Sequence, residues 1–113
     1  MPLDLSKLRK LVALDPNDPL SRFALGRRLF EEHAAGGPPD LLGEAAEHLA
    51  FANERNPEHL ATYHVLGQVL TALGRRDGAR RVFEAGIQRT DAVGEGMGRD
   101  LAPAMRELLA ALG

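Results

Sequence analysis

Apolar side chains recur along this chain at steps of three and four residues, the spacing of one face of an α-helix. The first such series consists of Leu5, Leu8, Leu11 and Val12, and the last of Leu101, Met105, Leu108, Leu109 and Leu112. Residues that favour strands are scarce, since isoleucine occurs once, at Ile87, and tryptophan is absent. The pattern therefore predicts an all-α fold.

Capping residues and helix breakers divide this pattern into six expected helices. Aspartate favours the N-cap position, and N-caps are expected at Asp4, Asp18, Asp40, Asp77 and Asp100. Pro19 suits the first helical position, and Asn56-Pro57 repeats the same order of cap and proline. Glycine and proline interrupt the pattern in AAGGPPD (34–40) and DAVGEGMG (91–98), and Gly74 is expected to end the fourth helix.

The bulk composition narrows the classes of protein. The chain has 113 residues, of which 44% are apolar and 27% charged, with a formal net charge of −2. This length supports one domain, and the charge does not favour nucleic acid or an anionic membrane as a partner. Without cysteine, disulfides and thiolate metal sites are excluded. Since no apolar run could span a bilayer and MPLDLSKLRK lacks a signal-peptide core, the cytoplasm is the expected location.

Equivalent residues recur at two fixed spacings. One spacing separates Ala45 from Ala79, Leu49 from Phe83, and Ala52 from Gly86. This period of about 34 residues indicates a repeated helix–turn–helix unit. A second spacing, longer by seven, separates Gly26 from Gly67 and Pro16 from Pro57. The excess must lie between Gly26 and Ala45, and we expect it in the loop 34–40.

The second copy of this unit resembles the tetratricopeptide repeat (TPR) family. It matches the pattern of that family at Tyr63, Leu66, Gly67, Leu70, Ala79, Phe83 and Gly86. The first copy is degenerate, because Arg22 replaces the aromatic residue and Leu49 the phenylalanine, and Asp91 replaces the closing proline of the second copy. The resemblance implies one α-solenoid domain with an N-terminal half-unit (3–14), repeat one (18–56), repeat two (57–90), a hinge (91–99) and a capping helix (100–112).

Two leucine–glycine pairs lie inside predicted helices, at Leu25-Gly26 and Leu66-Gly67. A glycine within a helix costs about 1 kcal/mol relative to alanine. We expect Gly67 to face its partner helix, with Ala79 opposite, so that the two backbones approach closely. A glycine tolerated without a role is the alternative, and recurrence in the same context argues against it.

The resemblance also implies a concave binding groove lined by the first helix of each repeat. The corresponding positions are Leu20, Phe23, Arg27 and Phe30 in repeat one, and Ala61, His64, Gln68 and Thr71 in repeat two. The lysine and asparagine clamp by which some members hold an acidic chaperone C-terminus is not matched. An apolar helix or extended peptide suits the groove better, with Arg27 as a bidentate anchor. Phe23 and Phe30 would form an exposed apolar patch or would pack in the core.

These features predict a non-catalytic scaffold for a protein or peptide partner of unknown identity, without a cofactor. The alternative is a self-associating module, a homodimer formed through the helix 100–112 or through Phe23 and Phe30. The last helix would instead cap the array in cis if it docked on its own chain.

Patterns for catalysis, metal binding or phosphate binding do not emerge. The four histidines are His33, His48, His59 and His64, and they lack the spacing of a metal-ligand set. GEGMG (94–98) follows no strand and has no phosphate-loop spacing. RRDGARR (75–81) is expected to be a solvated tip and not a nucleic-acid contact. Glu44, Glu47 and Glu54 share a helix with His48, and we expect them to form a solvated face.

Overall fold

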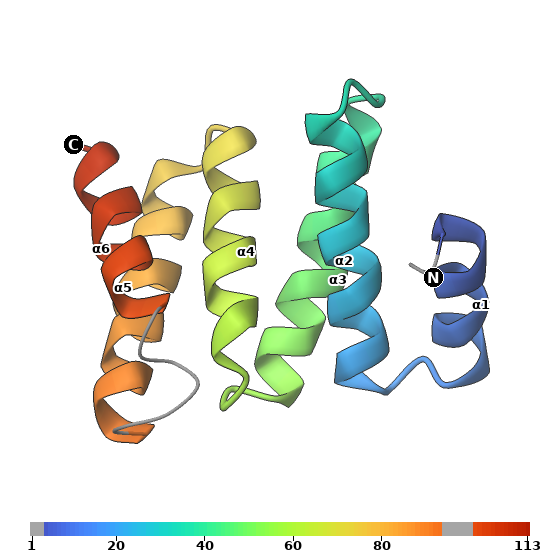
Figure 1. Ribbon diagram of the computed structural model, residues 1–113, viewed down its shortest axis with the longest axis horizontal. Coiled ribbons are helices and arrows are strands. Elements are labelled where there is room, and N and C mark those ends of the chain that lie inside the picture. The colour runs from blue at the N-terminus through green and yellow to red at the C-terminus, as the bar shows by residue number, and fades with distance from the viewer. Residues whose placement is uncertain (1–3, 94–100) are drawn as a thin grey trace. The chain divides into compact units, whose positions relative to one another are not determined.

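The computed structural model describes residues 4–93 and 101–113, and every regular element within them is an α-helix (Figure 1). The six helices are α1 (Leu5–Leu14), α2 (Pro19–Ala34), α3 (Asp40–Arg55), α4 (Leu60–Ala72), α5 (Arg76–Val93) and α6 (Leu101–Ala111). The predicted all-α fold is thus confirmed. The chain forms two compact units, residues 1–56 with α1–α3 and residues 57–113 with α4–α6.

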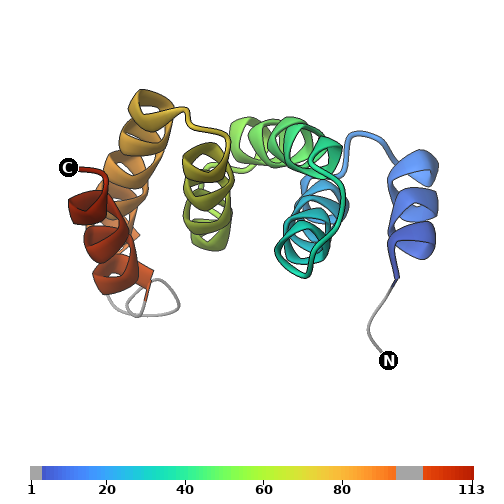
Figure 2. The ribbon, with the colours of Figure 1, turned by 90° about the horizontal axis from the view of Figure 1, so that it is seen from above.

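The first unit is built on the antiparallel pair α2 and α3, with α1 packed against α2 (Figures 1 and 2). Its core follows the helical periodicity of the sequence. The buried apolar residues are Leu8, Val12, Leu25, Leu29, Leu42, Ala45, Ala46, Leu49 and Ala52. Only Leu8 and Val12 of these lie on α1, so this helix is anchored by a small apolar contact.

The second unit contains the same kind of hairpin, α4 and α5, and adds α6, which packs against both helices. Its buried cluster consists of Tyr63, Ala79, Phe83, Met105 and Leu112. Met105 is fully buried although it lies on the last helix. The apolar stripe of α6 is therefore used within its own unit, as a capping helix requires.

Two expected N-caps are confirmed by hydrogen bonds. Asp4 Oδ1 accepts from the backbone N–H of Lys7 at 2.9 Å. Asp18 Oδ1 accepts from the N–H of Leu20 at 3.1 Å, and its Oδ2 accepts from the hydroxyl of Ser21 at 2.7 Å. Both side chains satisfy donors that the first helical turn leaves without an intrahelical partner.

The remaining caps differ from expectation. Asp40 and Asp77 lie inside the first turn of α3 and α5, where a carboxylate still interacts favourably with the helix dipole. Asn56 is the C-cap of α3, and the N-cap of α4 is His59. Asp100 lies outside the described residues.

The seven extra residues of repeat one are shared between helices and turn, which corrects the expectation of a single inserted loop at 34–40. Helix α2 continues three residues beyond Glu31, which is the equivalent of Ala72 at the end of α4. Helix α3 begins two residues before the equivalent of Arg76, the first residue of α5. Only residues 35–39 separate α2 from α3, whereas residues 73–75 separate α4 from α5. The first hairpin is therefore longer than the second.

Glycine ends the first helix of each hairpin in the same way. Gly36 has φ 105° and Gly74 has φ 79°, a left-handed conformation that side chains other than glycine rarely adopt. The N–H of Gly74 donates to the carbonyl of Thr71 at 3.0 Å, so the predicted end of the fourth helix is confirmed. At the other end of repeat two, α5 continues through Val93, so residues 91–93 of the expected hinge are helical. Residues 94–99 lie outside the described part of the chain.

Candidate partner-binding faces

Gly67 lies directly against Phe83, the largest fully buried side chain of the described residues. A Cβ added to Gly67 would stand 2.7 Å from Phe83 Cδ1 and closer still to its Cε1. Gly26 has the same role in the first unit, where an added Cβ would stand 2.6 Å from Leu49 Cγ. The close approach expected at both glycines is therefore found. The side chain nearest Gly67 is Phe83, however, and not Ala79 as expected.

We call the close helix contacts at Gly26 and Gly67 the glycine seam. The seam turns one side of α2 and of α4 towards the second helix of its hairpin, so a partner protein could contact only the other sides. On α2, Leu20 is 53% exposed and Arg27 is also exposed. Phe23 and Phe30 are partly buried, so they belong neither to the fully buried core nor to an exposed aromatic patch. The apolar group that α2 presents most openly among the candidate residues is thus Leu20.

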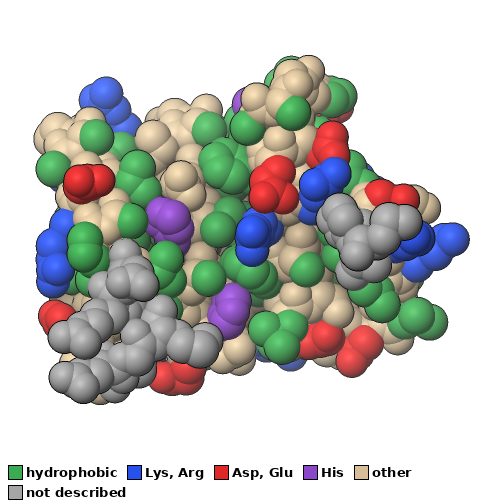
Figure 3. Space-filling view, viewed as in Figure 1, with side chains coloured by type: hydrophobic (Ala, Val, Ile, Leu, Met, Phe, Trp, Pro, Cys, Tyr) green, Lys and Arg blue, Asp and Glu red, His purple; other side chains and the backbone are tan. Residues whose placement is uncertain are grey.

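Opposite charges cover the neighbouring surface of α2, where acidic and basic side chains lie next to one another (Figure 3). Arg27 Nε lies 3.7 Å from Glu31 Oε2, and Arg28 Nη2 lies 2.9 Å from Glu32 Oε1. Exposed pairs of this kind contribute little to stability, because water screens them. Arg27 can therefore exchange Glu31 for a carboxylate of a partner at small cost.

Helix α4 presents a different surface. It contains no aspartate, glutamate, lysine or arginine from Leu60 to Ala72. Ala61, His64 and Gln68 are partly buried, and Thr71 is exposed while its hydroxyl donates to the carbonyl of Gly67 at 2.8 Å. Burial lowers the pKa of His64, which favours the neutral imidazole. The accessible side of α4 is consequently polar or apolar but not charged.

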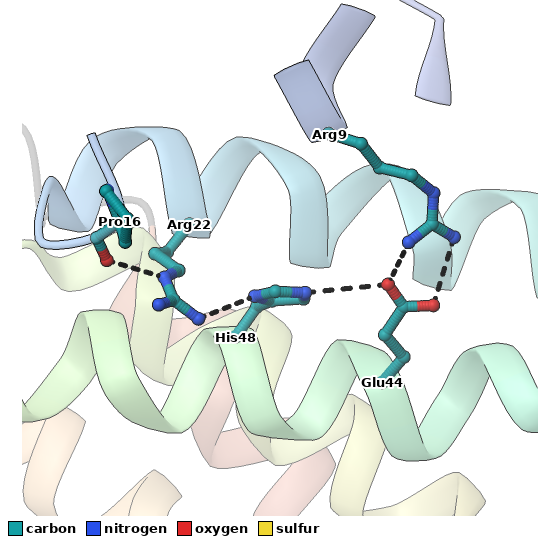
Figure 4. A network of polar contacts seen from close by, with 5 residues as sticks. All are labelled: Arg9, Pro16, Arg22, Glu44 and His48. Atoms are coloured by element: carbon teal, nitrogen blue, oxygen red, sulfur yellow. Dashed lines mark hydrogen bonds and ion pairs between the residues drawn. The ribbon is translucent and has the colours of Figure 1, made fainter. Parts of the chain in front are cut away.

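The eight predicted site residues form two sets, four on α2 in the first unit and four on α4 in the second. The first unit also contains a polar seam that the sequence pattern did not predict, and it consists of Arg9, Arg22, Glu44 and His48 (Figure 4). The expectation of a solvated face does not hold for His48, whose side chain is only 14% exposed. Glu44 is 29% exposed and pairs with Arg9. The one sequence signal for this polar seam was Arg22, a cation at the position where the repeat pattern has an aromatic residue.

Two further kinds of site are absent from the described residues. No three or more His, Asp or Glu side chains come together there in a way that could hold a metal ion. None of the described helices combines the length and apolar character needed to cross a membrane.

In each hairpin a glycine seam holds the two helices together, and the first helix keeps one side accessible. This arrangement is typical of the class of helical-repeat scaffolds that bind other proteins. No family model matches the chain. It is 32% identical over 80 residues to the TPR repeat-containing protein PA0015 of Pseudomonas aeruginosa, a match that covers 71% of this chain and 70% of that protein. The chain therefore belongs to the tetratricopeptide repeat family.

A solved structure supports the fold independently. The crystal structure of MamA protein matches with a TM-score of 0.63 at 22% identity, covering 96% of this chain. The chain spans 56% of the MamA chain, and at 22% identity the likeness concerns the fold alone.

Proposed function

We propose that this protein is a non-catalytic scaffold that binds a peptide or helix of a partner protein through the exposed side of the first helix in each unit, α2 in the first and α4 in the second. The observation that carries the proposal is the absence of charge on α4, in a chain whose residues are 27% charged. A helix that faces only water normally carries charged side chains on its outer side. The partly exposed residues of α4 are better suited to contact with an uncharged surface.

The two faces suggest the chemistry of the partner segment. Ala61, His64 and Gln68 offer small or neutral groups, which favour apolar and uncharged polar side chains. On α2, Leu20 offers an apolar contact and Arg27 a guanidinium that binds a carboxylate through two parallel hydrogen bonds. A segment with an acidic residue therefore suits α2, and an apolar or uncharged segment suits α4.

Site-specific photo-crosslinking tests this assignment. A photoreactive amino acid is placed at Gln68 on α4, at Arg27 on α2, and at the exposed control position Gln88 on α5. In native extract, mass spectrometry should identify the same protein from the first two positions and not from the third. Equal yields of that protein at Gln88 would contradict the proposal.

A charge substitution then tests the captured partner. Gln68→Glu places a carboxylate on the uncharged face, and Gln88→Glu places the same group on α5. Binding should weaken about tenfold for the first variant, the effect of roughly 1.4 kcal/mol, and remain unchanged for the second. Equal binding by both variants would eliminate α4 as the binding face.

Self-association is a second candidate, favoured by the exposed apolar side chains of α1. Leu14 is 82% exposed and Leu11 is 40% exposed, whereas Met105 and Leu112 are buried in their own unit. A second copy would therefore meet α1 and not α6. Light scattering at high concentration tests this, since a monomer contradicts self-association, and Leu14→Lys should dissociate any dimer formed through α1.

A further inference from the structure

A chain of polar contacts joins the three helices of the first unit (Figure 4). Arg9 of α1 donates to the carboxylate of Glu44 of α3 from both terminal nitrogens, Nη1 and Nη2, the latter at 3.0 Å from Oε1. His48, one turn along α3, has its Nε2 3.5 Å from the same carboxylate and its Nδ1 3.2 Å from Nη1 of Arg22 on α2. Arg22 Nε donates in turn to the carbonyl of Pro16 at 2.9 Å, in the connection between α1 and α2.

These partners determine the protonation state of His48. Arginine can only donate hydrogen bonds, so His48 Nδ1 must accept from Arg22 and cannot carry a hydrogen. The ring hydrogen then resides on Nε2 and points towards Glu44. The contacts therefore require a neutral imidazole between one cation and one anion.

Protonation of His48 conflicts with this arrangement. It would place an N–H on Nδ1, facing the guanidinium of Arg22. It would also add a cation beside Arg22 and beside Glu44, whose carboxylate is already paired with Arg9. Arg22 also lies 4.3 Å from the ring centroid of Phe51, and Arg55 lies 4.7 Å from the same ring, so a further cation is close. Burial lowers the pKa of His48, and the charge of Arg22 adds to this effect while Glu44 opposes it.

We propose that His48 is a pH-sensitive latch for α1, whose protonation expels Arg22 and releases the connection at Pro16. Helix α1 is suited to such local opening, because only Leu8 and Val12 anchor it in the core. Glu44 would move towards the new charge on His48 and share less of its carboxylate with Arg9. The latch is closed above the ordinary pKa of histidine, about 6.5, and opens as the pH falls below it.

Hydrogen exchange of the full chain measures this opening. Amide protection of residues 5–14 is compared with that of α2 and α3 at pH 7.5 and 5.5, after correction for intrinsic exchange rates. Protection of α1 should fall roughly fivefold more than that of α2 and α3 at the lower pH, the factor expected when one hydrogen bond is lost. An equal fall in all three helices would overturn the latch.

Three variants make the test specific. His48→Asn keeps an acceptor for Arg22 without a titratable ring, and should show the same α1 protection at both pH values. His33→Gln removes the other histidine of the unit, which is half-buried on α2, and should respond as the wild type does. If His48→Asn responds like the wild type, the latch is disproved.

An independent measurement covers the case in which His48→Asn does not fold. In Arg22→Gln, the third variant, the cation that faces His48 is gone, so NMR titration should find the pKa of His48 higher than in the wild type. The preferential loss of α1 protection at pH 5.5 should also shrink in this variant. An unchanged pKa together with unchanged α1 opening would reject the mechanism.

Discussion

Arg22 makes in the first unit the hydrogen bond that Tyr63 makes in the second. Arg22 Nε donates to the carbonyl of Pro16 at 2.9 Å, and the hydroxyl of Tyr63 donates to the carbonyl of Pro57 at 2.8 Å. The spacing between the two donors equals the spacing between the two prolines, so the contacts are equivalent in the repeat. Repeat one has therefore lost the aromatic residue but kept its bond to the turn before the helix.

The partner helix supplies an aromatic ring next to Arg22. Phe51 of α3 lies beneath the guanidinium of Arg22, at 4.3 Å from the ring centroid, and the equivalent residue of α5 is Ala85. The positions of Arg22 and Phe51 thus correspond in the repeat to those of Tyr63 and Ala85. A guanidinium stacked on a ring gains a favourable cation–π interaction.

Arg22→Ala should accordingly destabilise the first unit. It removes the donor to Pro16, the donor to His48 and the stacking on Phe51. Urea unfolding should report a loss of about 1–3 kcal/mol. Arg27→Ala, which removes an exposed arginine from the same helix, should leave the midpoint nearly unchanged, and an equal loss in both variants would contradict the structural role of Arg22.

Replacing glycine by alanine should change stability in opposite directions at two positions, one in the glycine seam and one outside it. Gly67→Ala forces a methyl group into Phe83 and should destabilise the second unit by about 1–3 kcal/mol. Gly43→Ala, inside α3, meets no atom within 4 Å and should stabilise by about 0.5–1 kcal/mol, because alanine favours the helix. Thermal unfolding of the two variants checks both signs, and a stabilising Gly67→Ala would refute the close packing.

The sequence predicted this seam because its signal is local and repeated. Leu66-Gly67 and Leu25-Gly26 occur in the same context, which indicates a close helix contact at both glycines. The sequence did not identify the residue opposite Gly67, which is Phe83 and not the expected Ala79. Helix ends set by hydrogen bonds within a few residues, such as the cap at Asp18, were also predictable. Features of this kind are predictable because they depend on residues that lie close together in the sequence or on a pattern that recurs.

The polar seam depends on partners far apart in the chain, so it was not predictable in the same way. Arg9 meets Glu44 across 35 residues and Arg22 meets His48 across 26. The spacing of Glu44 and His48 is equally compatible with a solvated helix face, and only the packing of α3 determines that His48 is largely buried. The division of the seven extra residues was hidden for a related reason, since AAGGPPD marks an interruption without fixing how far each helix extends into it.

His59 offers a stabilising substitution at the start of α4. It is the N-cap, with φ −83° and ψ 98°, and its equivalent in α2 is Asp18, with φ −76° and ψ 113°. His59 makes no side-chain capping bond to the backbone, although its Nδ1 lies 2.8 Å from the hydroxyl of Thr62. His59→Asp supplies a carboxylate that accepts from the first turn and should stabilise by about 1 kcal/mol in urea unfolding. His59→Ala is the control, and it should be less stable than His59→Asp.

The histidines of the second unit predict that its stability declines as the pH falls below the ordinary pKa of histidine, about 6.5. Burial lowers the pKa of His59 and of His64 below that value, which is the one expected in the unfolded chain. Between the folded and unfolded pKa values the unfolded state binds more protons, so this contribution is complete above the unfolded value and is lost as the pH falls through the folded one. Urea unfolding, monitored by hydrogen exchange in α4 and α5, should show this loss of stability at low pH. The double variant His59→Gln with His64→Gln should have a weaker dependence of stability on pH. His33→Gln, in the first unit, should leave the slope in α4 and α5 intact, and the same slope in the double variant would mean that other groups cause it.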